Sequence, residues 1–201
     1  MRVLCCLAVC SILSAANSVS AAETPDLSTP VVQGPIGERL HAYLRWAEQF
    51  GFSGVALAAM DGEIVLHQPY GLADRAQPIP NRLDSVFSFG SIAKQFTAAA
   101  IMKLEQEGRL STDDPITKYF DNIPPQKAGI TLHQLLTHSA GLIDYHGVHD
   151  FQKMSRDQAV RHILRSRLIA QPGEEFNYSN SGYSLAAAII ELVTGRDYIS
   201  Y

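Results

Sequence analysis

Hydrophobic residues recur every three or four positions in several stretches of the chain, which is the spacing of helices that bury one face. The first stretch predicts a helix from about Glu38 to Phe50. The second begins at Ser91 and continues to about Glu107, where Gly108 ends it. Three further helices are expected: Leu132 to His138, one opened by the capping box Ser155-Arg156-Asp157-Gln158, and about Gly182 to Thr194.

The same spacing predicts which side chains face the core. In the helix that begins at Ser91, these are Phe96, Ala99, Ala100 and Leu104. In the last two helices, they are Val160, Ile163 and Leu164, and then Leu185, Ile189 and Leu192.

One segment, residues 53–68, predicts a β-hairpin. Gly54 to Met60 is a short apolar run, Asp61-Gly62 is a turn signal, and Glu63 to Gln68 alternates around Ile64 and Leu66. The helices follow within a helical region, residues 84–201. Two strands alone are marginal in water, so we expect the complete fold to need more strands than this sequence contains.

The N-terminus has the features of a secretory signal, residues 1–22. Met1-Arg2 is followed by an apolar run from Val3 to Ala16 and by small residues that end at Ala22. We therefore expect export, with the protein periplasmic or secreted and without a stable membrane anchor. Residues 23–36 are polar and contain proline, so we expect a flexible leader there.

Composition and charge narrow the chemistry further. All three cysteines lie at positions 5, 6 and 10, inside the predicted signal, so the mature chain has no disulfide, thiolate metal site or cysteine nucleophile. The net charge is −4, and removal of residues 1–22, which hold Arg2 and no acid, makes it −5. No basic patch is present, so nucleic acid is not an expected partner.

Ser91-Ile92-Ala93-Lys94 offers a hydroxyl and an amine at the opening of a predicted helix. Residues three apart lie on one helix face, so the amine of Lys94 can reach the oxygen of Ser91. A serine becomes a strong nucleophile when a neighbouring base takes its proton. S-x-x-K is the nucleophile motif of β-lactamases and penicillin-binding proteins. The alternative is a helix cap at Ser91 and a solvated lysine.

Tyr178-Ser179-Asn180 stands just before the last predicted helix. A tyrosine can transfer a proton if a nearby cation such as Lys94 lowers its pKa. The amide of Asn180 could contact a substrate carbonyl or the lysine. The alternative is that Asn180 or Ser181 only caps the helix and that Tyr178 packs on the core.

For three histidines we expect neither a catalytic role nor a metal-binding role. No serine stands in G-x-S-x-G, so the nucleophile motif of α/β-hydrolases is absent. His138 is interpreted as a helix-end residue that bonds backbone carbonyls. His146 and His149, with Asp144 and Asp150 close by, are interpreted as solvated loop residues, because no H-E-x-x-H metal motif is present. We therefore expect no metal and no cofactor.

Four stretches together resemble the serine β-lactamase-related family, which comprises class C β-lactamases, D,D-carboxypeptidases and esterases. They are Gly71 to Asp74, Phe89 to Ala98, Ile130 to Leu142, and Pro172 to Tyr183. The resemblance implies an α+β fold of the β-lactamase/transpeptidase type. In that fold, helices flank an antiparallel sheet and a helical domain is inserted after the early strands. Residues 37–201 would be its N-terminal portion.

The resemblance also implies roles for individual residues. Ser91 would be the acylated nucleophile, with Lys94 as its proton partner and its own backbone N–H in the oxyanion hole. Tyr178 would act as base in acylation and as acid toward the leaving group. Asn180 would contact substrate and Lys94. The family's third motif, K-T-G or H-x-G on a later strand, is absent from these 201 residues, and so are the later strands of the sheet.

The expected function is therefore an exported serine hydrolase that forms an acyl-enzyme at Ser91 with an amide, a lactam or an ester. Its partner would be a small-molecule or peptide substrate with a carbonyl group. Because the third motif is absent, we expect residues 23–201 alone to be inactive and poorly folded. The alternatives are a non-catalytic ligand-binding or sensor domain and an inactive truncated product. The substrate and the oligomeric state are left open.

Overall fold

The computed structural model describes residues 26–147 and 152–201. The predicted signal, residues 1–22, lies outside the described residues. The chain divides into two compact units, residues 1–87 and 88–201. Among the described residues, no helix is both long enough and apolar enough to cross a membrane.

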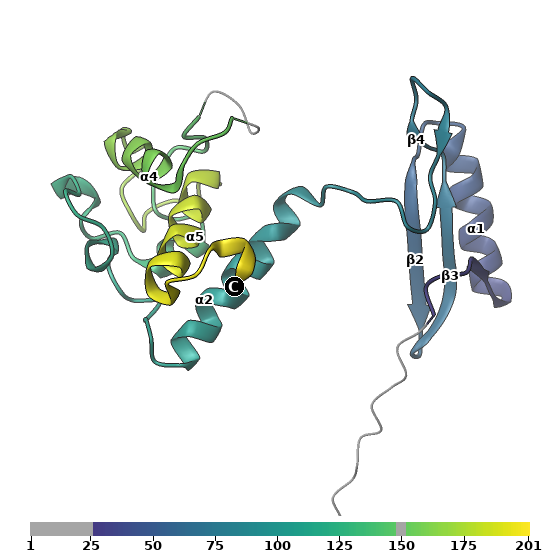
Figure 1. Cartoon of the computed structure of the whole chain (residues 1–201), viewed down its shortest axis with the longest axis horizontal. Coiled ribbons are helices and arrows are strands. Elements are labelled where there is room, and N and C mark those ends of the chain that lie inside the picture. The colour runs from purple at the N-terminus through teal and green to yellow at the C-terminus, as the bar shows by residue number, and fades with distance from the viewer. Residues whose placement is uncertain (1–25, 148–151) are drawn as a thin grey trace, which may run out of the picture. The chain divides into compact units, whose positions relative to one another are not determined.

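The first unit is a small antiparallel sheet with one helix, α1, against it (Figure 1). Three strands lie in the order β1-β3-β2, and β4 and β5 form a separate two-stranded ladder. The predicted hairpin is present, with β2 and β3 paired from Gly54 opposite Tyr70 to Met60 opposite Glu63. The elements are β1 (Val31–Val32), α1 (Gly34–Glu48), β2 (Gly54–Met60), β3 (Glu63–Tyr70), β4 (Leu72–Asp74) and β5 (Ile79–Pro80).

The prediction of a leader without structure is wrong for its second half. Val31 and Val32 pair with His67 and Leu66 at the free edge of β3, where two β-branched residues suit an extended strand. Then α1 begins at Gly34, before the predicted start, with a proline in its first turn, where the missing N–H costs nothing.

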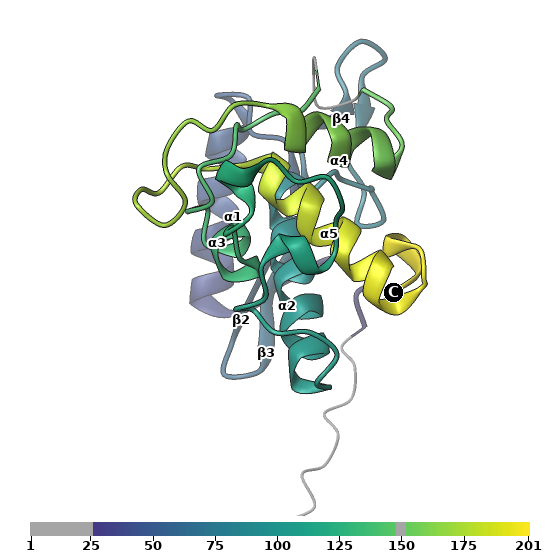
Figure 2. The same cartoon turned by 90° about the vertical axis from the view of Figure 1, so that its left-hand side faces the viewer.

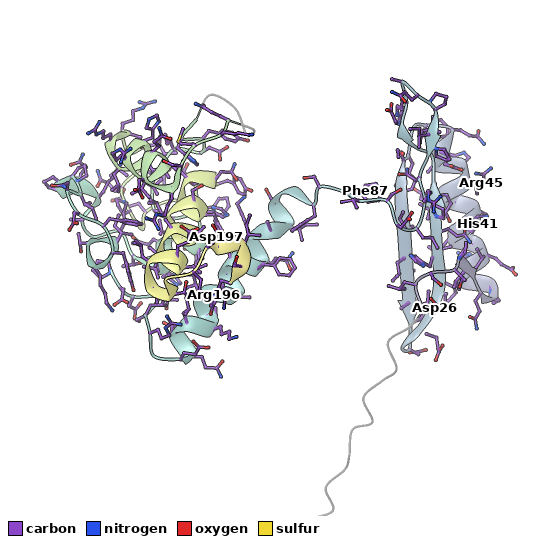
Figure 3. The ribbon with its side chains drawn as sticks, viewed as in Figure 1. Asp26, His41, Arg45, Phe87, Arg196 and Asp197 are labelled. Atoms are coloured by element: carbon purple, nitrogen blue, oxygen red, sulfur yellow. The ribbon has the colours of Figure 1, made fainter. Side chains whose placement is uncertain are left out.

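Close backbone approach seats α1 on β3. Gly37 is buried, and a Cβ there would collide with the carbonyl of Val65. One turn later on α1 is His41 (Figure 3), and its Nδ1 is 3.0 Å from the hydroxyl of Tyr70 on β3. Leu66 and Tyr70, both on β3, are buried.

The second unit is helical and is built around α5, which contacts α2, α3 and α4 (Figure 2). The predicted capping box at Ser155 with Gln158 is present, and Thr131 with Gln134 forms a second capping box. The α-helices are α2 (Ala93–Gln106), α3 (Leu132–Leu136), α4 (Arg156–Arg165) and α5 (Asn180–Thr194). The 3-10 turns are η1 (Gly90–Ile92), η2 (Ile116–Lys118), η3 (Pro125–Lys127) and η4 (Tyr198–Ser200).

The predicted inward faces are correct for α4 and partly wrong for α2 and α5. Phe96 is 66% exposed, and α2 instead buries Thr97, Ile101 and Leu104. Leu192 is 45% exposed, although Leu185 and Ile189 are fully buried as predicted. In α2 the buried stripe therefore lies about one residue away from the predicted one.

A buried lysine closes the C-terminal end of α4. Lys127 is 0% exposed, and its ammonium donates hydrogen bonds to the carbonyls of Ile163, Leu164 and Ser166 at 2.6, 3.0 and 2.7 Å. The last carbonyls of a helix have no partner within the helix, and a cation there also opposes the helix dipole. Lys127 thus links η3 to α4 within the core.

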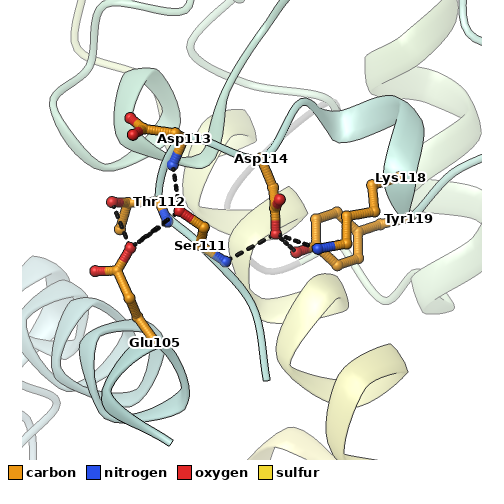
Figure 4. A network of polar contacts seen from close by, with 7 residues as sticks. All are labelled: Glu105, Ser111, Thr112, Asp113, Asp114, Lys118 and Tyr119. Atoms are coloured by element: carbon orange, nitrogen blue, oxygen red, sulfur yellow. Dashed lines mark hydrogen bonds and ion pairs between the residues drawn. The ribbon is translucent and has the colours of Figure 1, made fainter. Parts of the chain in front are cut away.

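Two carboxylates organise the turn that follows α2 (Figure 4). Glu105 accepts from the backbone N–H and the hydroxyl of Thr112, at 2.6 and 2.8 Å. Asp114 accepts from the Ser111 N–H, the Lys118 ammonium and the Tyr119 hydroxyl, at 2.8, 2.7 and 2.5 Å. Burial raises the pKa of Asp114, but these hydrogen bonds outweigh burial, so the net pKa lies below its ordinary value.

Candidate active site

Ser91 and Lys94 lie where η1 passes into α2. Gly90 precedes them with a φ of 50°, a conformation that glycine adopts readily, and the chain then turns directly into the helix. The three-residue spacing brings the side chains together as predicted: the Nζ of Lys94 donates to the Oγ of Ser91 at 3.2 Å. Both side chains belong to the second unit.

Tyr178 and Asn180 reach the same point from the start of α5. Ser179 is the N-cap of that helix, and its Oγ accepts from the N–H of Gly182, so the structure assigns the cap to neither Asn180 nor Ser181. The Tyr178 hydroxyl and the Ser91 Oγ share a hydrogen bond of 2.7 Å. The Oδ1 of Asn180 accepts from the Nζ of Lys94 at 2.6 Å.

The electrostatics of this cluster make the phenol of Tyr178 easier to ionise than a free tyrosine. Hydrogen bonding with Lys94, followed by hydrogen bonding with Ser91, lowers the pKa of Tyr178 below its ordinary value. The Lys94 Nζ also lies 4.9 Å from the centre of the Tyr178 ring. The Ser91 hydroxyl therefore lies within hydrogen-bonding distance of the Tyr178 oxygen, which can accept its proton, and of the Lys94 Nζ, which donates to the serine oxygen.

A second segment, residues 138–144, holds residues 177–181 in place. The Oδ1 of Asp144 accepts from the backbone N–H and the Nδ2 of Asn180 at 3.1 and 2.9 Å. This fixes the amide so that its oxygen points at Lys94. The carbonyl of Ile143 accepts from the Ser179 hydroxyl at 2.8 Å, and the carbonyl of Asp144 accepts from the Ser181 N–H at 2.9 Å.

Sequence reasoning missed the role of Asp144, which it treated only as a neighbour of histidines. The available signal was an acceptor side chain in a loop, in a chain whose last helix begins, like any helix, with N–H groups that have no partner within the helix. Such a signal does not say which loop meets which helix.

The prediction that His138 bonds backbone carbonyls is wrong for its ring. His138 follows α3 with a φ of 57°, and its Nδ1 accepts the N–H of Ser179 at 3.0 Å. Its ring stacks on Tyr178 with centroids 4.5 Å apart and planes at 30°. The histidine is thus a direct neighbour of the site rather than a helix-end residue bonding carbonyls.

No group of three or more metal-ligating side chains is present among residues 26–147 and 152–201. His146 is partly buried, with its Nδ1 3.3 Å from the Ser181 hydroxyl. Burial and nearby His162 lower the pKa of His146. His149 and Asp150 lie outside the described residues.

The four candidate residues line one pocket of about 440 Å³ in the second unit. Tyr145, His146 and Met154 contribute further walls. The hydroxyl of Ser91 thus opens onto a space that can hold a small molecule, with Lys94 and Tyr178 beside it. Such an arrangement can remove the serine proton and return it to a departing group.

Comparison with known proteins gives the family. A β-lactamase family model matches residues 44–201. Penicillin-binding protein 4* of Bacillus subtilis (strain 168) is 34% identical over 161 residues, which cover 77% of this chain and 35% of that protein. This chain thus spans about a third of the length of that relative.

Solved structures agree with this comparison. FmtA from Staphylococcus aureus superimposes with a TM-score of 0.75 at 26% identity, over 86% of this chain and 48% of that one. D-amino acid amidase from Ochrobactrum anthropi SV3, complexed with D-phenylalanine, gives a TM-score of 0.71 at 29% identity, over 82% of this chain and 47% of that one. These neighbours and the helices and antiparallel strands described above confirm the α+β fold class. The chain therefore belongs to the β-lactamase family, of which it matches the N-terminal part.

Proposed function

We propose that this chain carries the nucleophile of an exported serine hydrolase that forms an acyl-enzyme at Ser91. The observation that supports this most is the triangle of Ser91, Lys94 and Tyr178, in which the serine oxygen is 2.7 Å from the phenol and 3.2 Å from the amine. Family membership supports the same reaction class. The substrate would be an amide, a lactam or an ester, since each offers a carbonyl carbon and a leaving nitrogen or oxygen.

The proposed chemistry has two halves. The Oγ of Ser91 bonds to the carbonyl carbon, and its proton passes to the phenolate form of Tyr178, which Lys94 stabilises before the transfer. The bond from the carbonyl carbon to nitrogen or oxygen then breaks, and Tyr178 returns the proton to the leaving group. Water afterwards attacks the ester on Ser91, which releases the acid and restores the hydroxyl.

The roles of the remaining parts follow from their positions. The backbone N–H of Ser91, at the opening of α2, would donate to the oxyanion; one such donor contributes about 3 kcal/mol in other hydrolases. Asn180 would contact the substrate while keeping Lys94 in place. Export is supported by the signal-like pattern of residues 1–22.

Covalent labelling tests the proposal on the intact protein from its native source and on variants of its intact gene product. Incubation with a fluorescent penicillin and with a p-nitrophenyl ester should add one acyl group per chain, measured by intact-protein mass spectrometry. Ser91→Ala should abolish the gain, whereas Ser200→Ala, at an exposed serine in η4, should keep it.

Two results would count against hydrolysis at Ser91. If the folded parent is never labelled, the acyl-enzyme is refuted. Saturable binding of the same probes that survives Ser91→Ala, without a mass gain, would favour the ligand-binding alternative.

A further inference from the structure

His138 contacts the residues on both sides of Tyr178. Its backbone carbonyl accepts the N–H of Asn177 at 2.7 Å, and its ring Nδ1 accepts the N–H of Ser179 at 3.0 Å. The φ of 57° at His138 allows one residue to make both contacts. This left-handed conformation is uncommon outside glycine, and it is tolerated best by Asn, Asp and His.

The ring of His138 also supports the ring of Tyr178 directly. The two rings stack at 4.5 Å, and Tyr183 lies 5.1 Å from His138 on another side. Phe176 meets the histidine edge-on at 5.7 Å. Three aromatic contacts and two backbone hydrogen bonds therefore fix the position of the phenol relative to Ser91.

The hydrogen bond from Ser179 requires a particular protonation state. A backbone N–H can donate only to an unprotonated Nδ1, so the ring must be neutral with its proton on Nε2. In a protonated ring, the Nδ1–H of His138 and the backbone N–H of Ser179 would both be donors and could not bond. The ring would also carry a positive charge near Lys94. That would weaken the link to Ser179, and with it the placement of Tyr178 and Asn180.

The charged and titratable groups around His138 favour the neutral ring. Burial lowers its pKa most, Lys94 on α2 lowers it further, and Asp144 in the adjoining loop raises it. Tyr178 and Tyr183, before and within α5, are the other titratable groups that contact the ring. Together with the hydrogen bond from the Ser179 N–H, these effects favour the neutral ring, so protonation of His138 requires a lower pH than that of a free imidazole.

We propose that His138 is a positioning residue which, when neutral, holds Tyr178 and Asn180 in reacting geometry and which, when protonated, releases them. The catalytic part of this inference rests on the proposed function; the structural part does not. The nucleophile and its proton partners would then be switched off in acid by a residue that does not line the pocket.

Two substitutions separate the hydrogen bond from the ring. His138→Asn keeps an acceptor close to the position of Nδ1 and tolerates the left-handed φ, but its side chain does not titrate. His138→Ala removes both the acceptor and the stacking surface. His133→Asn, at an exposed histidine on α3, is the matched control.

The first readout needs no activity. In ¹H–¹⁵N spectra recorded from pH 8 down to the lowest pH at which the protein stays folded, the Ser179 amide of the parent should shift with the titration of the His138 ring, which is followed in the same samples. The same amide should be independent of pH in His138→Asn and should titrate normally in His133→Asn. A Ser179 amide that does not shift while the His138 ring of the parent takes up its proton would overturn the proposal.

The second readout is the rate of acylation at Ser91 against pH. The parent should lose rate in acid with the same inflection as the amide, and His138→Asn should lose that inflection. His138→Ala should be slower at every pH by about 10- to 100-fold in kcat, with KM little changed, as expected for a misplaced proton-transfer group.

Profiles of His138→Asn and the parent that superimpose would overturn the switch, because a merely structural histidine would leave the acid limb unchanged. If His138→Ala does not fold, the Asn variant and the amide titration still decide. If the parent is not acylated at all, the proposed function has failed, and the amide titration alone then decides the role of His138.

Discussion

Removal of the buried ammonium of Lys127 should destabilise the second unit strongly. The variant Lys127→Met keeps the length and apolar stem of the side chain but withdraws the donor from the carbonyls of Ile163, Leu164 and Ser166. Because methionine fills nearly the same volume, the change reports on the hydrogen bonds and the charge rather than on a cavity.

The contacts give the size of the effect. A buried acceptor that loses its partner costs about 1–3 kcal/mol. Ile163 retains a second donor, the Ser166 hydroxyl at 2.7 Å, so the carbonyls of Leu164 and Ser166 dominate the loss. Two such losses make about 2–6 kcal/mol, and the desolvation of the ammonium, which the variant no longer suffers, offsets part of it. We expect a net loss of about 2–4 kcal/mol in the free energy of unfolding.

Thermal unfolding followed by circular dichroism measures this loss on the intact gene product. At about 2–4 °C per kcal/mol for a domain of this size, the melting temperature should fall by about 4–16 °C. Lys103→Met is the control, because that lysine is exposed on α2. Substitutions at exposed positions usually change stability by less than about 0.5 kcal/mol, so the control should change little. A Lys127→Met protein that melts within about 1 °C of the parent would refute the reasoning.

Other predictions concern glycine, acid stability and the site. Gly141→Ala should cost more stability than Gly108→Ala, because both have positive φ but only the first would press a Cβ against neighbouring backbone; equal denaturation midpoints would contradict this. Asp114→Asn should lower the free energy of unfolding by about 1–3 kcal/mol at pH 7. Because the folded pKa of Asp114 lies below its unfolded value, this contribution is present above that value and is lost as pH falls through the folded pKa. In urea unfolding, the difference in free energy of unfolding between the parent and Asp114→Asn should therefore shrink below about pH 4, and a difference that stays constant would contradict the prediction. Asp144→Ala, which frees Asn180, should slow labelling at Ser91 by about tenfold or more with little change in melting temperature; unchanged kinetics would exclude a role in orientation.

Local features of the sequence predicted local features of the structure. The contact between Ser91 and Lys94 follows from three-residue spacing at a helix opening, and the capping box at Ser155 follows from residue type and spacing. The contact of Tyr178 and Asn180 with these residues was implied by family resemblance. Residue spacing alone does not predict that contact, because Tyr178 and Asn180 are far from Ser91 and Lys94 in the chain.

Failures of the sequence analysis have physical causes. A strand of two residues, such as β1, has no periodicity to detect, and its stability comes from the edge of β3. In α2 the alanines mark no clear face, so the large Phe96 was assigned inward although it is 66% exposed. The support of the site by His138 and Asp144 depends on tertiary pairing of two loops, which residue spacing does not encode.

The most direct test of the central claim is to locate the acyl group. Trypsin cleavage after Arg82 and Lys94 gives a peptide of residues 83–94, which contains Ser85, Ser88 and Ser91. After labelling of the intact protein with a penicillin or an activated ester, tandem mass spectrometry should place the whole adduct on Ser91. An adduct on Ser85 or Ser88, or on a peptide elsewhere in the chain, would contradict the account.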